Sequence, residues 1–173
     1  RLLAGSRVKL ASAVDFPIAD MTTAGKVAEA RELVALGAVE LDVTANVGWL
    51  KSGLEREFRD DIRAVVDAAR PAAVKVMLEL PLLSPAERDR AVELAVEAGV
   101  RYVKNASSSA VEIATPESIR YLRERVPPTV GVKASGGIKS FGQAVALLDA
   151  GADLIGSSAG VAIVTGAPDG ESY

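Results

Sequence analysis

The chain has 173 residues, a net charge of −3, 49% hydrophobic residues and 25% charged residues, which is the composition of an ordinary globular domain. The weak charge gives no reason to expect nucleic acid or a membrane surface as a partner, and no apolar run is long enough to span a bilayer. There is no cysteine and no histidine, so disulfides and thiolate chemistry are excluded, and catalysis must use lysine, carboxylates, serine or tyrosine. Because no signal peptide is visible, we expect a cytoplasmic protein.

Short apolar segments alternate with longer segments of helical periodicity along the whole chain. The apolar segments lack strict alternation, as is typical of strands covered on both faces, and span residues 7–14, 39–47, 74–80, 101–105, 130–134 and 153–156. The helical segments span residues 22–36, 54–69, 85–98, 116–126 and 141–150. Strands that alternate with helices predict a parallel sheet.

One sequence pattern recurs where helices end. In ALGAVEL, EAGVRYV and DAGADLI a helix runs into a glycine and then into a strand, so Gly37, Gly99 and Gly151 are the predicted helix ends. No linker divides the chain, and we predict a single domain over residues 1–173. The glycine-rich residues 166–173 are predicted to form a mobile tail.

Two α/β architectures compete for this pattern. An open doubly wound sheet needs a phosphate-binding fingerprint after its first strand, and the sequence VDFP at residues 14–17 is not one. A TIM barrel instead places its chemistry at the carboxyl ends of several strands, which is where Asp42, Lys104, Lys133 and Ser158 are found. We therefore predict a (β/α)8 barrel, of which this chain supplies about six strand–helix units.

Lysines inside the predicted strands suggest the chemistry. A lone strand lysine usually reaches solvent at an edge, and we assign Lys9 and Lys75 to that class. Lys104 and Lys133 lie near the C-terminal ends of two predicted strands. Two ammonium groups that face one pocket repel each other, and burial adds to the effect. One of them then becomes a free amine that forms a Schiff base with a carbonyl, while Asp42 moves protons through water. This chemistry needs neither a metal nor a histidine.

Four segments resemble the deoxyribose-phosphate aldolase family: VELDVTANVGWLKSG, YVKNASSSAVEIATPESI, GVKASGGIKS and the closing GSSAGVAIV. The resemblance runs from about Val8 to the last residue. It implies a (β/α)8 barrel and reversible cleavage of 2-deoxyribose 5-phosphate to acetaldehyde and glyceraldehyde 3-phosphate, without a cofactor. It implies that Lys104 forms the Schiff base, that Lys133 lowers its pKa and that Asp42 relays protons.

The resemblance also implies a phosphate site and a tyrosine that assists proton transfer. The family binds phosphate with backbone amides at the ends of its last strands, and the matching residues are Ser107, Ser108, Gly136, Gly137, Gly156 and Ser158. Glycine lets the backbone approach a phosphate closely. A plain strand-to-helix turn remains the alternative for Gly136 and Gly137. Tyr173 matches the family's terminal tyrosine.

Several residues depart from the family pattern. Thr-Ser-Thr-Gly after the Schiff-base lysine becomes Asn-Ala-Ser-Ser at residues 105–108, and Glu-Thr-Gly becomes Glu-Leu-Pro at residues 79–81. Gly-Phe-Pro becomes Asp-Phe-Pro, so that Asp15 is expected to add a negative charge at the mouth. The family's first two strands have no counterpart before Arg7, which predicts two open sheet edges.

Two functions follow from these observations. The first is a class I aldolase that acts on a phosphorylated or closely related sugar aldehyde, as a homodimer or with its barrel completed by another chain. The second is a degenerate aldolase-fold protein that serves as a partner subunit or structural component without this activity. The presence of Asp42, Lys104 and Lys133 together favours the aldolase, because a decayed site is expected to lose at least one of them.

Overall fold

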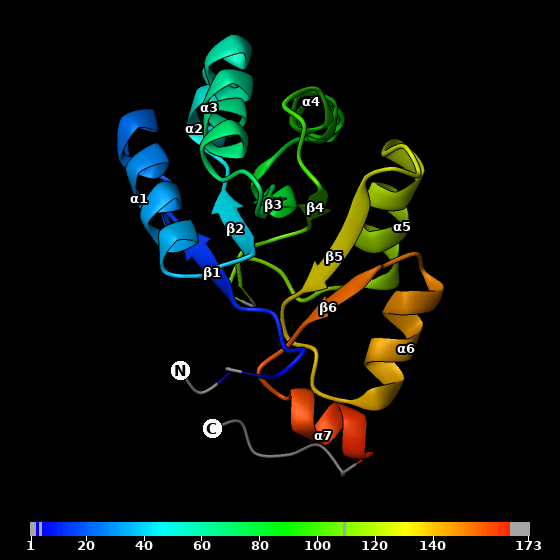
Figure 1. Cartoon of the computed structure of the whole chain (residues 1–173). Helices are drawn as coiled ribbons and strands as arrows, with labels where there is room; N and C mark the ends of the chain where they lie inside the picture. The colour runs from blue at the N-terminus through cyan, green and yellow to red at the C-terminus, as the bar shows by residue number, and fades with distance from the viewer. Residues whose placement is uncertain (1–2, 4, 109, 167–173) are drawn as a thin grey trace.

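The computed structural model describes residues 3, 5–108 and 110–166, and in this part of the chain the strands form one parallel sheet in the order β1-β2-β3-β4-β5-β6. The sheet curls into a partial barrel with the long helices on its outer side (Figure 1). The strands are β1 (Ala11–Val14), β2 (Glu40–Thr44), β3 (Ala73–Met77), β4 (Tyr102–Lys104), β5 (Gly131–Ser135) and β6 (Leu154–Gly156). The predicted parallel strands in chain order are confirmed.

A helix follows each strand, as a barrel of strand–helix units requires. The helices are α1 (Thr23–Ala35), α2 (Val47–Lys51), α3 (Glu55–Ala68), α4 (Pro85–Glu97), α5 (Pro116–Arg125), α6 (Phe141–Asp149) and α7 (Gly160–Thr165), with a 3-10 turn η1 (Leu80–Leu82) after β3. No helix in the described residues is long and apolar enough to cross a membrane. The tail prediction for residues 166–173 falls almost wholly on residues that the structure does not describe.

The core fills the layer between the sheet and the outer helices. Helix α3 shows the principle, because Phe58, Ile62 and Val65 recur on one helical face and are at most 1% exposed. Fully burying one such side chain stabilises the fold by about 1.5–3 kcal/mol. The predicted helix ends are also confirmed, since Gly37, Gly99 and Gly151 all have positive φ.

Three strands differ from the prediction by more than one residue at a boundary. The predicted strand 74–80 ends at Met77, and Leu80 begins the 3-10 turn η1. Residues 7–10, which include the charged Arg7 and Lys9, precede β1 instead of forming part of it, because the register between β1 and β2 begins with Ala11 opposite Glu40. The segment after β2 turns at once into α2, because the side chain of Asn46 accepts a hydrogen bond from the backbone N–H of Trp49 and caps a new helix. Val47 therefore begins a helix instead of ending a strand.

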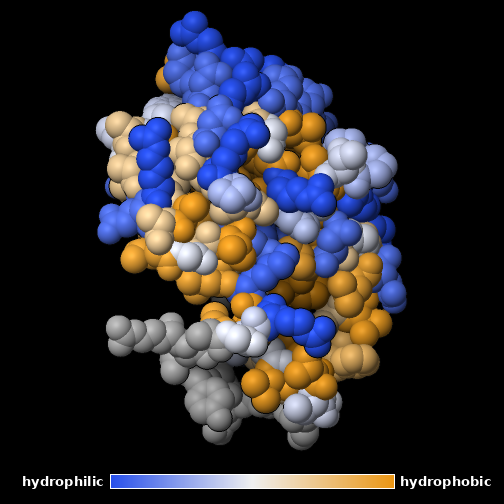
Figure 2. All heavy atoms as spheres, viewed as in Figure 1, coloured by the Kyte–Doolittle hydropathy of each residue, from blue (hydrophilic) through white to orange (hydrophobic). Residues whose placement is uncertain are grey.

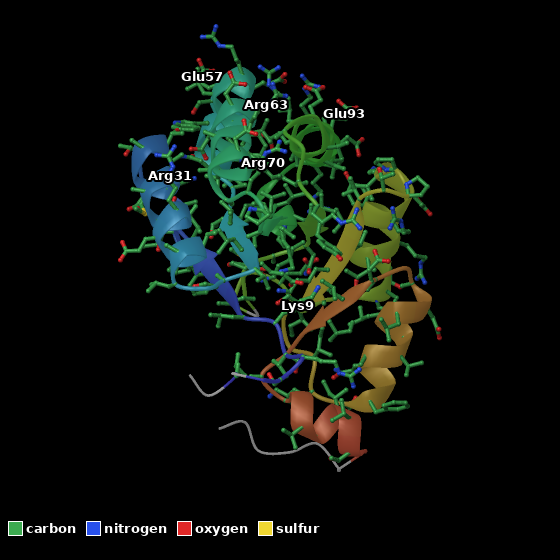
Figure 3. All side chains as sticks on the ribbon, viewed as in Figure 1. Lys9, Arg31, Glu57, Arg63, Arg70 and Glu93 are labelled. Atoms are coloured by element: carbon green, nitrogen blue, oxygen red, sulfur yellow. The ribbon has the colours of Figure 1, made fainter. Side chains whose placement is uncertain are left out.

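Charge and apolar surface are distributed unevenly. The labelled Arg31, Arg63, Arg70 and Glu93 are exposed on or beside the outer helices α1, α3 and α4 (Figure 3). Hydrophilic residues dominate the surface over α3, whereas apolar residues gather in the hollow of the sheet and over α6 and α7 (Figure 2). Among the described strands β1 and β6 each pair on one side only, so the two predicted open edges are present.

Candidate active site

The side chain of Asp42 lies at the centre of a group of buried charges inside the curled sheet. Its Oδ2 accepts hydrogen bonds from Nζ of Lys133 at 2.5 Å and Nζ of Lys104 at 3.3 Å. The sheet creates this convergence, because β4 and β5 pair with Lys104 directly opposite Lys133. The structure thus brings together three of the four predicted catalytic residues. The fourth, Tyr173, lies outside the described residues.

The prediction that Lys75 reaches solvent is wrong. Lys75 was assigned to the lysines that reach solvent, but its side chain is only 1% exposed. Its Nζ lies 2.6 Å from Oε2 of Glu40 and donates to Oδ1 of Asp42 at 3.1 Å. Two carboxylates supply the counter-charge that a buried ammonium requires. Lys9 was assigned correctly, since its side chain is 71% exposed.

The electrostatics of the group favour a free amine at Lys104. Burial lowers the pKa of Lys104, the Asp42 carboxylate opposes this lowering, and Lys133 adds to it, so that the pKa lies below its usual value. Burial alone raises the pKa of Asp42, but the charges of Lys133, Lys104 and Lys75 outweigh it and hold that pKa below its usual range. The carboxylate therefore stays ionised while Lys104 is biased towards the neutral form.

An open cavity of about 250 Å³ gives access to these groups. Its lining combines the charged group with apolar and small side chains from β1 and β3: Ala11, Ser12, Ala13, Phe16, Asp42, Met77, Lys104 and Lys133. The Sδ atom of Met77 lies 3.3 Å from Nζ of Lys104. An apolar lining with a few convergent polar groups is typical of a small-molecule site.

Glu79 is a buried carboxylate that the sequence analysis named only as the unchanged first residue of a segment that departs from the family. It is 4% exposed, has a left-handed backbone with φ of 51°, and accepts from the backbone N–H of Ser107 at 2.7 Å and from its Oγ at 3.2 Å. Burial raises the pKa of Glu79, although the bonds from Ser107 and the charge of Lys104 act against this. The signal in the sequence was a lone carboxylate that ends an apolar strand.

The predicted phosphate residues lie on three consecutive strand ends. The hydroxyl and amide of Ser107 are engaged by Glu79, while Ser108 is half-buried. Gly156 lies beside Lys133, because a Cβ there would come within 3.1 Å of Cε of Lys133. Ser158 is exposed. Their role in binding phosphate stays a prediction.

The loops after β5 and β6 lie side by side. The hydroxyl of Ser157, which precedes Ser158, donates to the carbonyl of Ile138 at 2.6 Å. Ile138 directly follows the predicted phosphate residues Gly136 and Gly137. This hydrogen bond therefore joins the loop after β5 to the loop after β6, and both loops belong to the predicted phosphate site.

Gly136 and Gly137 form a tight turn, as the alternative interpretation expected. Both have positive φ, and a Cβ on Gly136 would lie 2.1 Å from the carbonyl oxygen of Glu112. The backbone N–H of Ala114 also donates to the carbonyl of Gly136 at 2.9 Å. Packing therefore requires glycine at position 136 whether or not the turn binds phosphate. The role of the turn in binding phosphate stays a prediction.

We expect Gly136→Ala to lower the free energy of unfolding by roughly 1–3 kcal/mol, because the side chain meets backbone at a left-handed φ. The matched control is Gly142→Ala in α6, where a Cβ meets no atom within 4 Å and alanine is the better helix former. Denaturant unfolding of both variants measures the difference. Equal stabilities for the two variants would contradict the packing of this turn.

The predicted position of Asp15 is also wrong. Asp15 was expected to add negative charge at the mouth, but it is only 6% exposed, and its Oδ2 lies 3.2 Å from Nζ of Lys26. Lys26 is itself fully buried and also bonds Oδ2 of Asp61 at 2.8 Å. This second charged group, one ammonium between two carboxylates, ties the end of β1 to helices α1 and α3.

Comparison with known proteins agrees with this geometry. The family model described as "DeoC/LacD family aldolase" matches residues 9–166. The chain belongs to this family. A curated deoxyribose-phosphate aldolase from Brevibacillus brevis is 48% identical over 166 residues, which is 96% of this chain and 75% of that protein. Another from Alkaliphilus oremlandii is 46% identical over 169 residues, covering 97% of this chain and 76% of that protein.

Solved DeoC/LacD-like structures show the same fold. The structure described as "QR15, an Aldolase" matches with a TM-score of 0.89 and 33% identity, covering 94% of this chain and 73% of that one. The deoxyribose phosphate aldolase from Aeropyrum pernix, described as a unique tetrameric structure, matches with a TM-score of 0.83 and 32% identity, covering 91% and 67%. The curled six-stranded sheet is therefore a partial (β/α)8 barrel of the DeoC/LacD family.

Proposed function

We propose that this chain is a class I aldolase that reversibly cleaves 2-deoxy-D-ribose 5-phosphate, or a close sugar aldehyde, to acetaldehyde and glyceraldehyde 3-phosphate. The observation that carries the proposal is a single carboxylate, Asp42, which accepts hydrogen bonds from two lysines in one open cavity. The names of the curated relatives support the substrate. No observation favours the alternative of a degenerate partner subunit.

The proposed reaction begins at Lys104. Its neutral Nζ attacks C1 of the open-chain aldehyde, and loss of water leaves a protonated imine. The C3 hydroxyl then loses its proton as the C2–C3 bond breaks, and the electron pair of that bond passes into the imine. Glyceraldehyde 3-phosphate leaves, and the enamine remains on Lys104. Protonation at C2 and hydrolysis release acetaldehyde and restore the amine.

The neighbouring groups divide the remaining work. Lys133 repels a proton on Lys104 and so helps to keep the nucleophile free. Asp42 is ionised and lies in contact with both amines, which suits it to relay protons through water to and from C3 and C2. The amides near Gly136, Gly137, Gly156 and Ser158 are proposed to hold the phosphate.

Borohydride trapping tests the proposal directly. Acetaldehyde followed by borohydride should add one two-carbon unit to the peptide that contains Lys104, as read by mass spectrometry. Cleavage of 2-deoxyribose 5-phosphate is followed in parallel through released glyceraldehyde 3-phosphate. Labelling at Lys133 with Lys104 unmodified would refute the assignment of the nucleophile, and trapping without cleavage would refute the substrate.

We expect Asp42→Asn to reduce the cleavage rate by about 10²-fold or more while trapping at Lys104 persists, because the proton relay is lost and the nucleophile remains. Stability should also fall by about 3–5 kcal/mol, since buried ammonium groups lose their counter-charge. Steady-state kinetics, trapping and thermal unfolding measure the three effects. The control is Asp67→Asn, at a side chain that is 59% exposed, and it should change none of them. Full cleavage activity in Asp42→Asn would remove Asp42 from the mechanism.

We also propose that the protein assembles as a homodimer. Apolar side chains support this, because Val161 and Val164 on α7 are 76% and 81% exposed. One solved relative, the Aeropyrum pernix protein, is described as tetrameric. Light scattering during size-exclusion chromatography at micromolar concentration gives the mass, and a single monomeric peak would contradict the proposal.

A further inference from the structure

Asn105 lies immediately after Lys104, at the point where the backbone pairing of β4 with β5 ends. The last residues paired between these strands are Lys104 and Lys133. Oδ1 of Asn105 accepts from the backbone N–H of Ser135 at 2.9 Å, and Nδ2 donates to the backbone carbonyl of Ser135 at 2.9 Å. The side-chain amide thus bonds Ser135 as the peptide groups of a neighbouring strand would, and it extends the ladder one step beyond the two lysines.

The remaining polar groups of Asn105 bind two further segments. Nδ2 also donates to Oε2 of Glu112 at 2.7 Å, in the segment that packs on the turn after β5. The backbone carbonyl of Asn105 accepts from the N–H of Leu80 at 3.1 Å, just after β3. Asn105 is completely buried, so none of these bonds competes with solvent. One side chain and its backbone therefore join the carboxyl ends of three strands.

We propose that Asn105 is a positioning residue that fixes the spacing of Lys133 and Lys104 against Asp42. The inference rests on the proposed function, because it concerns the same two lysines. Ser135 follows Lys133 by two residues on β5, so holding the backbone N–H and carbonyl of Ser135 holds that half of the strand against β4. An amide is suited to this task, because it presents its donor and its acceptor on two separate atoms to the carbonyl and the N–H of one residue, whereas a hydroxyl must make both bonds through a single oxygen.

The geometry around Lys133 makes this spacing important. Its Nζ is 2.5 Å from Oδ2 of Asp42, and its side chain is 16% exposed at the open side of the sheet. Lys104 is held independently, because its carbonyl accepts from the N–H of Leu78 on the β3 side. If the end of β5 moves, Lys133 withdraws and Lys104 remains. Lys104 then loses a repelling charge and gains solvent, and both changes raise its pKa.

The test is the pH dependence of borohydride trapping of acetaldehyde at Lys104, measured on the full chain. Asn105→Leu keeps the size of the side chain and removes every side-chain hydrogen bond. We expect its trapping midpoint to rise by about half a unit, with a roughly threefold lower trapping rate at pH 7 that recovers in alkali. Asn105→Thr, which retains one hydroxyl, should shift the midpoint in the same direction by less.

Three comparisons make the result specific. Glu112→Gln keeps an acceptor for Asn105 and removes only charge, so its midpoint should match that of the wild type. In a Lys133→Leu background, Asn105→Leu should add little further shift, because the proposed effect passes through Lys133. Circular dichroism establishes that each variant is folded, and Asn105→Thr carries the test if the leucine variant does not fold.

The outcomes separate this inference from the proposed function. If wild-type Lys104 is not trapped at all, the proposed function fails. If the wild type is trapped and folded Asn105 variants keep its pH midpoint, Asn105 does not position the lysines. An equal shift in Glu112→Gln would assign the effect to charge and overturn the positioning role. An additive shift in the Lys133→Leu background would overturn the route through Lys133.

Discussion

Replacing Lys104 by methionine should eliminate both cleavage of 2-deoxyribose 5-phosphate and borohydride labelling with acetaldehyde. Methionine has a similar length and suits a buried site, but it has no amine to form the imine. Loss of the nucleophile from a covalent mechanism costs about 10⁴-fold or more in turnover, because no neighbouring group replaces the missing bond. Steady-state kinetics and mass spectrometry of the Lys104 peptide measure the two losses.

Folding and chemistry can be separated in this experiment. Lys104 is 6% exposed and its ammonium requires a counter-charge, so methionine should leave the thermal midpoint unchanged or higher. Lys51→Met is the matched control, because the Lys51 side chain is 48% exposed outside the cavity. It should keep full activity and labelling. Substantial cleavage by folded Lys104→Met would show that another residue forms the imine.

The core of this site was predictable from the sequence. Strand–helix alternation predicts a parallel sheet, and the carboxyl ends of parallel strands meet at one edge. Asp42, Lys104 and Lys133 each lie near such an end, so their convergence follows from topology without knowledge of any side-chain contact. The open edges were predicted from the family resemblance, because the family's first two strands have no counterpart before Arg7.

The partners of the other buried charges could not be predicted in this way. Lys75 resembles a strand lysine that reaches solvent, and only the register that sets it opposite Asp42 shows that it is paired. Asp15 resembles a surface charge, until the fold brings Lys26 within 3.2 Å of it. Such pairs join residues that are distant in sequence, and residue type alone does not indicate burial. Asn105 was identified only as a departure, because its partner Ser135 lies thirty residues away.

Replacing Lys133 by leucine should cause a loss of activity that depends on pH. Burial is the largest cause of the lowered pKa of Lys104, and Lys133 adds to the lowering against the opposing effect of Asp42. Removing Lys133 therefore leaves burial opposed by Asp42, and the pKa of Lys104 rises. A rise of one unit reduces the free amine about tenfold at any pH below the pKa. Alkali removes the proton from Lys104 directly, so the loss should diminish as pH rises.

A change in the ionisation of Asp42 does not complicate the pH dependence expected for Lys133→Leu. The pKa of Asp42 is held below the usual range by three lysines, and the variant keeps Lys104 and Lys75 beside it. Removing Lys133 raises that pKa, but Lys104 and Lys75 still oppose the effect of burial, so we expect the carboxylate to remain ionised near neutrality and above. Any change in the profile between neutral pH and alkali therefore reports on Lys104.

The measurement is a pH–rate profile of folded Lys133→Leu from mild acid to alkali, beside the wild type and Lys51→Leu. The rate ratio between wild type and Lys133→Leu should be largest at low pH and shrink towards alkali, whereas Lys51→Leu should follow the wild type throughout. The trapping rate at Lys104 should show the same displaced midpoint, because imine formation needs the same free amine. A rate ratio that is equal at every pH would contradict electrostatic coupling. Lys133 would then act by contacting the substrate or by supporting the shape of the cavity.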